Sequence, residues 1–130
     1  MTRRVVTLGH DSTIGDALAA VAEHQVRHLP IVEEGAVVGM LSDRDLRRVE
    51  GLVALDVGHP ERSEARLAAP VATLLEGEAV TVSPSTPIDH VIDRMLDEHV
   101  GAVAVVRDDG RLVGLVSYVD ILRAARGRLR

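Results

Sequence analysis

The sequence carries two hydroxyl–carboxylate pairs with the same spacing, Ser42 with Asp45 and Ser117 with Asp120. A serine followed three residues later by an acidic residue resembles a capping box, which satisfies backbone N–H groups at a helix start, although Glu or Gln is the usual partner. A serine hydroxyl can also act as a nucleophile, but only beside a suitable base. No Ser-His-Asp or Cys-His set with a plausible mutual placement is visible, so we expect that the chain is not an enzyme.

The residue types that are missing exclude several kinds of chemistry. Cysteine is absent, and all 15 basic residues are arginine, which excludes thiolate catalysis, thiolate metal sites and a catalytic or phosphate-binding lysine. Among six histidines, only His90 and His99 share a predicted helix, and their spacing does not bring them together. We therefore predict no catalytic residue, no metal site and no resident cofactor.

Charge and aromatic content argue against nucleic acid as a partner. The formal net charge is −5, so no overall positive charge attracts the phosphate backbone. Tyr118 is the only aromatic residue, so the chain has too few aromatic side chains on which bases could stack. No apolar segment reaches the length of a membrane span, and no basic stretch precedes an apolar run at the N-terminus. We expect a cytoplasmic protein that contacts neither nucleic acid nor membrane.

The chain contains an internal repeat. Residues 26–32 align with residues 100–106, and residues 35–46 align with residues 110–121, with one extra turn residue in the second copy. Each copy begins with a short β-prone run, over residues 5–8 in the first and 79–82 in the second. A polar turn follows each run, and apolar residues then recur at helical spacing. Two apolar strands joined by a glycine-containing turn and a last helix follow. The sequence thus predicts an α+β fold made of two β-α-β-β-α repeats.

The boundaries of the repeats follow from the same pattern. We assign residues 1–49 to the first repeat, 50–69 to a linker that lacks a clear pattern, and 70–126 to the second repeat. The segment from Pro70 to Leu75 is expected to lead into the second copy as a short helix, and Pro87 fits the first turn of its helix. The terminal arginines could contact acidic partners or a neighbouring subunit, but we interpret them as a frayed tail; they are Arg123, Arg126, Arg128 and Arg130.

The duplicated pattern, with "HLPIV" before the first Ser-x-x-Asp motif, resembles the CBS domain, named after cystathionine beta-synthase. The resemblance covers nearly the whole chain apart from the linker and the arginine-rich tail. It implies that the two repeats pack through their sheets with pseudo-twofold symmetry, since a single repeat is too small to cover its own apolar face. It also implies a homodimer, to which helices over residues 13–25 and 86–99 would contribute.

The resemblance further implies that adenosine-type nucleotides (AMP, ADP, ATP or S-adenosylmethionine) bind as regulatory ligands in clefts between the repeats. The motif aspartate would accept hydrogen bonds from the ribose 2′ and 3′ hydroxyls, because a carboxylate only accepts. The serine and the N–H groups of the helix start suit a phosphate. One crossed site would combine Val5, Val6, Val26, Arg27 and His28 with Leu115, Ser117 and Asp120. The other would combine Ala79, Val80, Val100 and Gly101 with Met40, Ser42 and Asp45.

These two sites are expected to differ. The side chains of Arg27 and His28 can carry positive charge or donate hydrogen bonds to a phosphate, whereas Gly101 and Ala102 have no such side chains. We predict that the site with Asp120 prefers phosphorylated nucleotides. On this hypothesis the chain is a non-catalytic sensor. Ligand binding would change the angle between the repeats or between subunits, and an unknown regulated protein would recognise that change. The alternative is a structural or interaction homodimer in which side chains such as Arg27 or Met40 fill the clefts and nothing binds.

Overall fold

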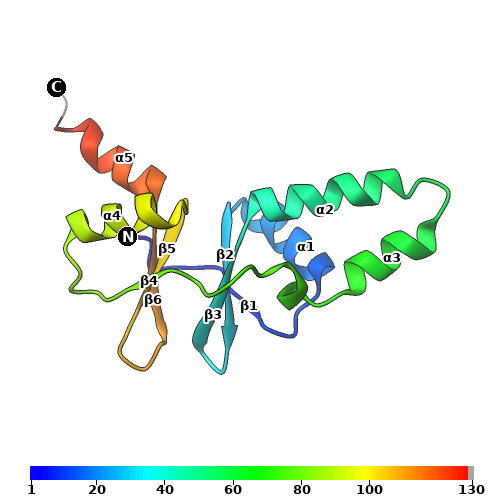
Figure 1. The fold of residues 1–130 in the computed structure, drawn as a ribbon, viewed down its shortest axis with the longest axis horizontal. Coiled ribbons are helices and arrows are strands. Elements are labelled where there is room, and N and C mark those ends of the chain that lie inside the picture. Colours follow the sequence, from blue (N-terminus) through cyan, green and yellow to red (C-terminus); the bar gives the residue numbers. More distant parts are fainter. Residues whose placement is uncertain (129–130) are drawn as a thin grey trace. The chain divides into compact units, whose positions relative to one another are not determined.

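A computed structural model describes residues 1–128 of the chain. The residues form two compact units, which we describe separately (Figure 1). The first unit contains residues 6–33 and 38–78, and the second contains residues 1–5, 34–37 and the chain from Ala79 onward. Arg130, one of the four terminal arginines, lies outside the described residues.

The first unit is built on a sheet with the strand order β1-β2-β3. Strand β1 runs parallel to β2, with Leu8 opposite Ile31. The predicted strand over residues 5–8 is shorter than expected and shifted. The elements are β1 (Leu8–Gly9), α1 (Ile14–His24), β2 (His28–Glu33), β3 (Ala36–Ser42), α2 (Asp43–Leu55), α3 (Pro60–Ala68) and the 3-10 helix η1 (Val71–Leu74).

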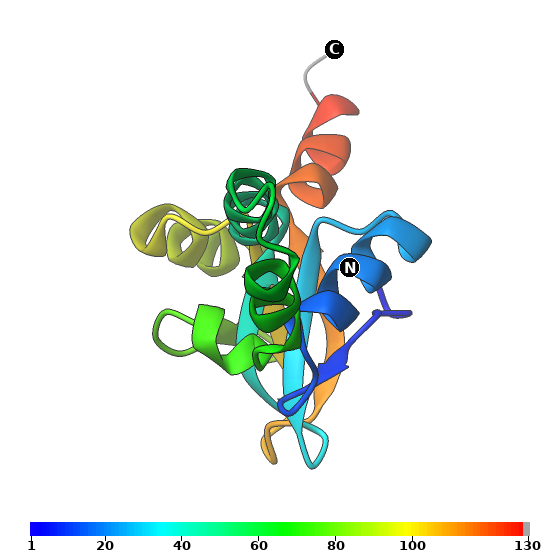
Figure 2. The same ribbon diagram turned by 90° about the vertical axis from the view of Figure 1, so that its right-hand side faces the viewer.

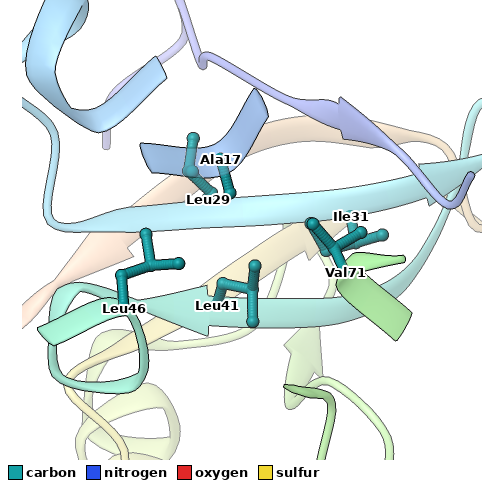
Figure 3. Close-up of a cluster of buried hydrophobic side chains, with 6 residues drawn as sticks. All are labelled: Ala17, Leu29, Ile31, Leu41, Leu46 and Val71. Carbon is teal, nitrogen blue, oxygen red and sulfur yellow. The ribbon is translucent and has the colours of Figure 1, made fainter. Parts of the chain in front are cut away.

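A core of aliphatic side chains holds these elements together (Figure 3). Figure 3 shows one side chain from each of α1, β3, α2 and η1 gathered around two from β2. Their burial removes apolar surface from water, which is the main favourable term in folding. The buried residues are Ala17, Leu29, Ile31, Leu41, Leu46 and Val71.

Val71 in this core changes the interpretation of residues 70–75. The sequence predicted a short helix that leads into the second repeat. The helix forms as η1, but its buried residue Val71 packs in the core of the first unit. A short apolar segment between two repeats can cover either of two cores, and periodicity alone does not distinguish them.

The segment predicted as a linker is largely helical. Helix α2 continues to Leu55, and α3 packs against α1 and α2. Asp56 is buried at the end of α2, and its Oδ2 lies 2.7 Å from Nε of Arg66. The segment looked unpatterned because α3 has no buried residue and carries many charges, so its apolar periodicity is weak.

The second unit repeats the same architecture with the strand order β4-β5-β6. Strand β4 is parallel to β5, and β5 is antiparallel to β6, with Ala102 opposite Ser117. Its core contains Val82, Val91, Met95, Val103 and Val105. The elements are β4 (Thr81–Val82), α4 (Ile88–Glu98), β5 (Ala102–Val106), β6 (Leu112–Ser117) and α5 (Tyr118–Arg126).

Two local predictions need correction in this unit. Pro87 is the N-cap of α4, one residue before the first turn in which it was expected. Arg123 and Arg126 belong to α5, which continues to Arg126 and projects away from the sheet (Figures 1 and 2), so they are not part of a frayed tail. The predicted α+β class and the β-α-β-β-α order of each repeat are confirmed.

The N-terminal residues extend the sheet of the second unit. The backbone N–H and C=O of Thr2 both pair with Leu115 of β6, each at 2.9 Å. This pairing needs Gly114, because a Cβ at that position would lie 2.7 Å from Sδ of Met1 and 2.8 Å from the carbonyl oxygen of Thr2. The absence of a side chain at Gly114 thus allows a segment of chain to lie directly against β6.

Candidate functional site

The motif of the first unit lies where β3 ends and α2 begins. Ser42 has extended backbone angles and is the N-cap of α2, and its hydroxyl accepts a hydrogen bond from the N–H of Asp45 at 3.4 Å. In return, Oδ2 of Asp45 accepts from the N–H of Ser42 at 2.9 Å and from its hydroxyl at 3.0 Å. The predicted capping box is present, and Asp45 is half-buried.

The motif of the second unit has the same geometry. Oδ2 of Asp120 accepts from the N–H of Ser117 at 2.9 Å and from its hydroxyl at 3.2 Å, and the Asp120 N–H donates to Ser117 Oγ at 3.3 Å. The cap of each motif therefore uses only one carboxylate oxygen, Oδ2. A carboxylate has two oxygens with about four lone-pair sites, so the cap does not use up its accepting capacity.

A third capping box provides an internal comparison. Thr13 caps α1, and Asp16 accepts from the Thr13 N–H at 2.9 Å while its own N–H donates to the threonine hydroxyl at 3.1 Å. Asp16 is exposed, whereas Asp45 and Asp120 are half-buried. The two reciprocal hydrogen bonds to the backbone are common to all three boxes, and the two repeat boxes add a bond from the serine hydroxyl to the aspartate. The two repeat aspartates also differ from Asp16 in being half-buried.

Within each unit, the residues before the second strand lie beside the motif. The N–H of Asp43 donates to the carbonyl of Arg27 at 2.8 Å, and the N–H of Tyr118 donates to the carbonyl of Gly101 at 3.0 Å. Burial lowers the pKa of His28 below its ordinary value, and the charge of Arg27 lowers it further, although the carboxylate of Asp43 opposes this shift. His28 is therefore biased towards the neutral form at neutral pH.

The predicted ligand-binding residues are almost all half-buried, as the walls of a partly open site would be. The exception is Arg27, which is exposed. The crossed combinations join residues of the two units and stay a prediction. The half-buried residues are Val5, Val6, Val26, His28, Met40, Ser42, Asp45, Ala79, Val80, Val100, Gly101, Leu115, Ser117 and Asp120.

Sequence reasoning missed the role of Thr2. Leu115 was assigned to one crossed site, on the same side as Ser117 and Asp120. The backbone N–H and C=O of Leu115 each form a hydrogen bond with Thr2, so the N-terminal segment lies directly beside this residue. A β-prone first strand was visible from Val5 onward, but pairing at Thr2 depends on long-range contacts that a local pattern does not report.

The second unit also contains an open pocket of about 480 Å³ beside β4 and α4. It contains none of the predicted ligand residues. Its hydroxyl, imidazole, guanidinium and carboxylate groups can form hydrogen bonds with a small polar molecule. The lining residues are Thr81, Val82, Ser83, Thr86, His90, Asp93 and Arg94.

No described helix is long and apolar enough to cross a membrane. No group of three or more histidine, cysteine or acidic side chains among residues 1–128 is arranged to hold a metal ion.

The fold and the paired motifs define a protein made of two copies of one α+β repeat, each with a capped Ser-x-x-Asp sequence at its last helix. The family model of the CBS domain matches residues 1–51 and 71–127. The chain belongs to the CBS domain family. The segment between the two matches contains the end of α2 and all of α3.

Several known proteins are similar over nearly the whole chain. A CBS domain-containing protein of Dictyostelium discoideum is 28% identical over 123 residues, which cover 94% of this chain and 85% of that protein. The uncharacterized protein MJ1225 of Methanocaldococcus jannaschii is 28% identical over 128 residues, but this chain spans only 46% of its length.

Two solved structures were determined with adenosine-containing ligands. The CBS domain pair of MJ0100, in complex with 5′-methylthioadenosine and S-adenosyl-L-methionine, has a TM-score of 0.77 and 26% identity, and the match covers 98% of this chain and 93% of that one. The cytosolic domain of the Mg²⁺ channel MgtE, in complex with ATP, has a TM-score of 0.74 and 25% identity, with coverage of 95% and 46%.

Proposed function

We propose that this chain is a non-catalytic regulatory module that binds adenosine-type nucleotides through Asp45 and Asp120. The observation that carries the proposal is the half-buried carboxylate of each repeat, which the cap fixes through Oδ2 alone. A carboxylate held in this way needs no reorganisation to accept hydrogen bonds from the two vicinal hydroxyls of a ribose. The ligands in the structures of the MJ0100 CBS domain pair and of the cytosolic domain of MgtE all contain adenosine, and they support this choice of ligand class.

The base is expected to lie against aliphatic side chains. The chain has no Phe or Trp, so an adenine ring would pack against residues such as Val5, Val6, Val80 and Val100, which are half-buried. Such a pocket gains affinity from the apolar area that it removes from water. It cannot add the stacking energy that aromatic side chains supply.

The two proposed sites differ in charge. In the crossed arrangement, Arg27 and His28 belong with Asp120, while Gly101 and Ala102 belong with Asp45. Because burial lowers the pKa of His28, the permanently charged guanidinium of Arg27 is the group that we expect to contact a phosphate. We propose that the site with Asp120 takes AMP, ADP or ATP, and that the site with Asp45 takes a less charged adenosyl ligand or none.

Regulation follows if the nucleotide binds one conformation of the chain better than another. A ligand shifts a conformational equilibrium only by its differential affinity for the two states. The regulated protein would then recognise the conformation that the nucleotide favours. In this scheme the chain transmits a signal and performs no covalent chemistry.

The test is isothermal titration calorimetry of the chain with AMP, ADP, ATP, S-adenosylmethionine and 5′-methylthioadenosine, together with 2′-deoxy-AMP. We expect binding of at least one ribonucleotide, and weaker binding of 2′-deoxy-AMP than of AMP by about 10-fold or more, since a hydrogen bond to a charged group contributes about 1.5–3 kcal/mol. Equal affinity for AMP and 2′-deoxy-AMP would overturn the assignment of the aspartates. Absence of binding for the whole panel would instead support the structural homodimer.

A further inference from the structure

The pocket beside β4 and α4 shares no residue with the proposed nucleotide sites. Its volume is about 480 Å³, and its lining residues all come from the segment between Thr81 and Arg94. Val82, one of them, belongs to the buried core of the second unit, so one wall of the pocket is part of a packed framework. Ligand pockets typically measure about 300–1,000 Å³, so a small organic molecule fits this volume.

Hydroxyl groups line the side of the pocket formed by β4 and the turn before α4. The N–H of Ser83 donates to Oγ1 of Thr86 at 3.0 Å, and the N–H of Thr86 donates to the carbonyl of Ser83 at 3.1 Å. The hydroxyl of Thr81, on β4, has no hydrogen-bond partner among residues 1–128. The reciprocal bonds fix two hydroxyl groups before a ligand arrives, which lowers the entropic cost of binding.

Helix α4 supplies one negative and one positive side chain to the pocket, Asp93 and Arg94. Both are exposed, and within the described part of the chain neither side chain forms an ion pair or a hydrogen bond. A carboxylate only accepts hydrogen bonds, and a guanidinium only donates them. The pocket therefore offers a ligand one full charge of each sign, and both groups keep their whole hydrogen-bonding capacity.

The first unit lacks these charges at the corresponding positions. In the alignment of the two copies, Ala19 and Ala20 stand in place of Asp93 and Arg94. Helix α1 forms with alanine at both positions, so the repeated fold does not require a charge at either one. The charge pair is a property of the second copy alone, and folding of the repeat does not explain it.

His90, which also lines the pocket, has no role in capping its helix. The corresponding residue of the first copy is Asp16, whose carboxylate accepts a hydrogen bond from the N–H of Thr13 in the cap of α1. At α4 the N-cap is Pro87, and no side chain caps the helix. The imidazole is therefore available to a ligand as a further hydrogen-bonding group.

The two charges indicate which kind of molecule the pocket can hold. A phosphate would be repelled by the carboxylate of Asp93, and a simple cation would be repelled by the guanidinium of Arg94. A molecule that carries both charges is attracted by both groups. A free amino acid has a carboxylate, to which a guanidinium can donate two parallel hydrogen bonds, and an ammonium group, which donates to a carboxylate.

We propose that this pocket binds a free α-amino acid, with Arg94 at its carboxylate and Asp93 at its ammonium group. The hydroxyl of Thr81 and the imidazole of His90 then contact the side chain of the amino acid, which favours a polar one. The proposal does not depend on nucleotide binding, so the Asp120→Ala variant should bind the amino acid as the unmodified chain does.

The first test is NMR titration of the isotope-labelled chain with each of the standard L-amino acids. At least one with a polar side chain should shift the backbone signals of residues 81–94 in a saturable way. The α-amide of that amino acid lacks the carboxylate charge, and its Nα-acetyl derivative lacks the ammonium charge. Each should bind more weakly by about 10-fold or more. Absence of a saturable shift in these residues, or equal affinity for either derivative, would overturn the proposal.

Two charge-removing variants with matched controls assign the contacts. Arg94→Gln should weaken binding of the amino acid by about 10-fold or more, while Arg62→Gln, which changes an exposed arginine of α3, should not. Asp93→Asn should remove the preference for the amino acid over its Nα-acetyl derivative, while Asp97→Asn, outside the pocket on the same helix, should keep it. Circular dichroism checks that each variant is folded. Unchanged affinity in Arg94→Gln, or an unchanged preference in Asp93→Asn, would contradict the assigned contacts.

Discussion

Substitution of Asp120 by alanine separates the two roles assigned to this side chain, the helix cap and the ribose contact. The change removes Oδ2, which accepts hydrogen bonds at 2.9 Å and 3.2 Å from Ser117, and it also removes the second oxygen that we assign to the ligand. The cap hydrogen bonds and the proposed ligand contact both depend on this half-buried carboxylate at the start of α5. Stability and affinity should therefore both fall, for different reasons.

The two effects have different expected sizes. Loss of one partner of a helix cap typically costs about 1 kcal/mol of unfolding free energy. Loss of a charged acceptor for two ribose hydroxyls should cost about 1.5–3 kcal/mol of binding free energy, which corresponds to roughly 10- to 150-fold in Kd. A partly exposed site favours the lower half of that range, because water can replace part of the lost interaction.

The matched control is Asp16→Ala. Asp16 forms the same type of capping box with Thr13, but it is exposed and no ligand contact is assigned to it. Urea denaturation should show a similar loss of stability for Asp16→Ala and Asp120→Ala. Calorimetry with AMP or ATP should show a loss of affinity for Asp120→Ala only. Unchanged nucleotide affinity in Asp120→Ala would refute the reasoning and leave Asp120 as a helix cap.

Two further predictions concern stability without ligand. His28 has a pKa lowered from 6.5, so the unfolded chain binds its proton more readily, and the free energy of unfolding should fall as the pH drops from about 6.5 towards the lowered pKa. His28→Gln should make urea midpoints depend less on pH in that range, and an unchanged dependence would show that other groups cause it. Gly114→Ala should lower the melting temperature, since its Cβ would lie 2.8 Å from the backbone of the N-terminal segment, at a cost of about 1–3 kcal/mol. Gly51→Ala, in an exposed helix with nothing within 4 Å, should instead raise stability by about 0.5–1 kcal/mol; equal effects of the two changes would contradict the proposed contact.

The sequence predicted helices and caps correctly where the pattern was local and present in both repeats. Both helices that follow the first strands, and both Ser-x-x-Asp caps, formed where the apolar spacing and the capping pattern predicted. Two segments pack in a different unit from the repeat to which the sequence pattern assigned them, and this could not be predicted from local patterns. Thr2 pairs with Leu115, and Val71 packs in the first core, through contacts between residues far apart in the sequence, which a local pattern does not report.

At the candidate site, the local spacing predicts the capping boxes, but it does not predict how deeply their aspartates are buried. Spacing alone makes Thr13–Asp16 and Ser42–Asp45 equivalent, because both place an acceptor three residues after a hydroxyl and both form a capping box. The structure separates them by burial, since Asp45 is half-buried and Asp16 is exposed. Partial burial of an acidic side chain has a desolvation cost that a cap on an exposed helix avoids. The two half-buried aspartates therefore call for an explanation beyond helix capping, and a ligand whose hydroxyl groups replace the lost water provides one.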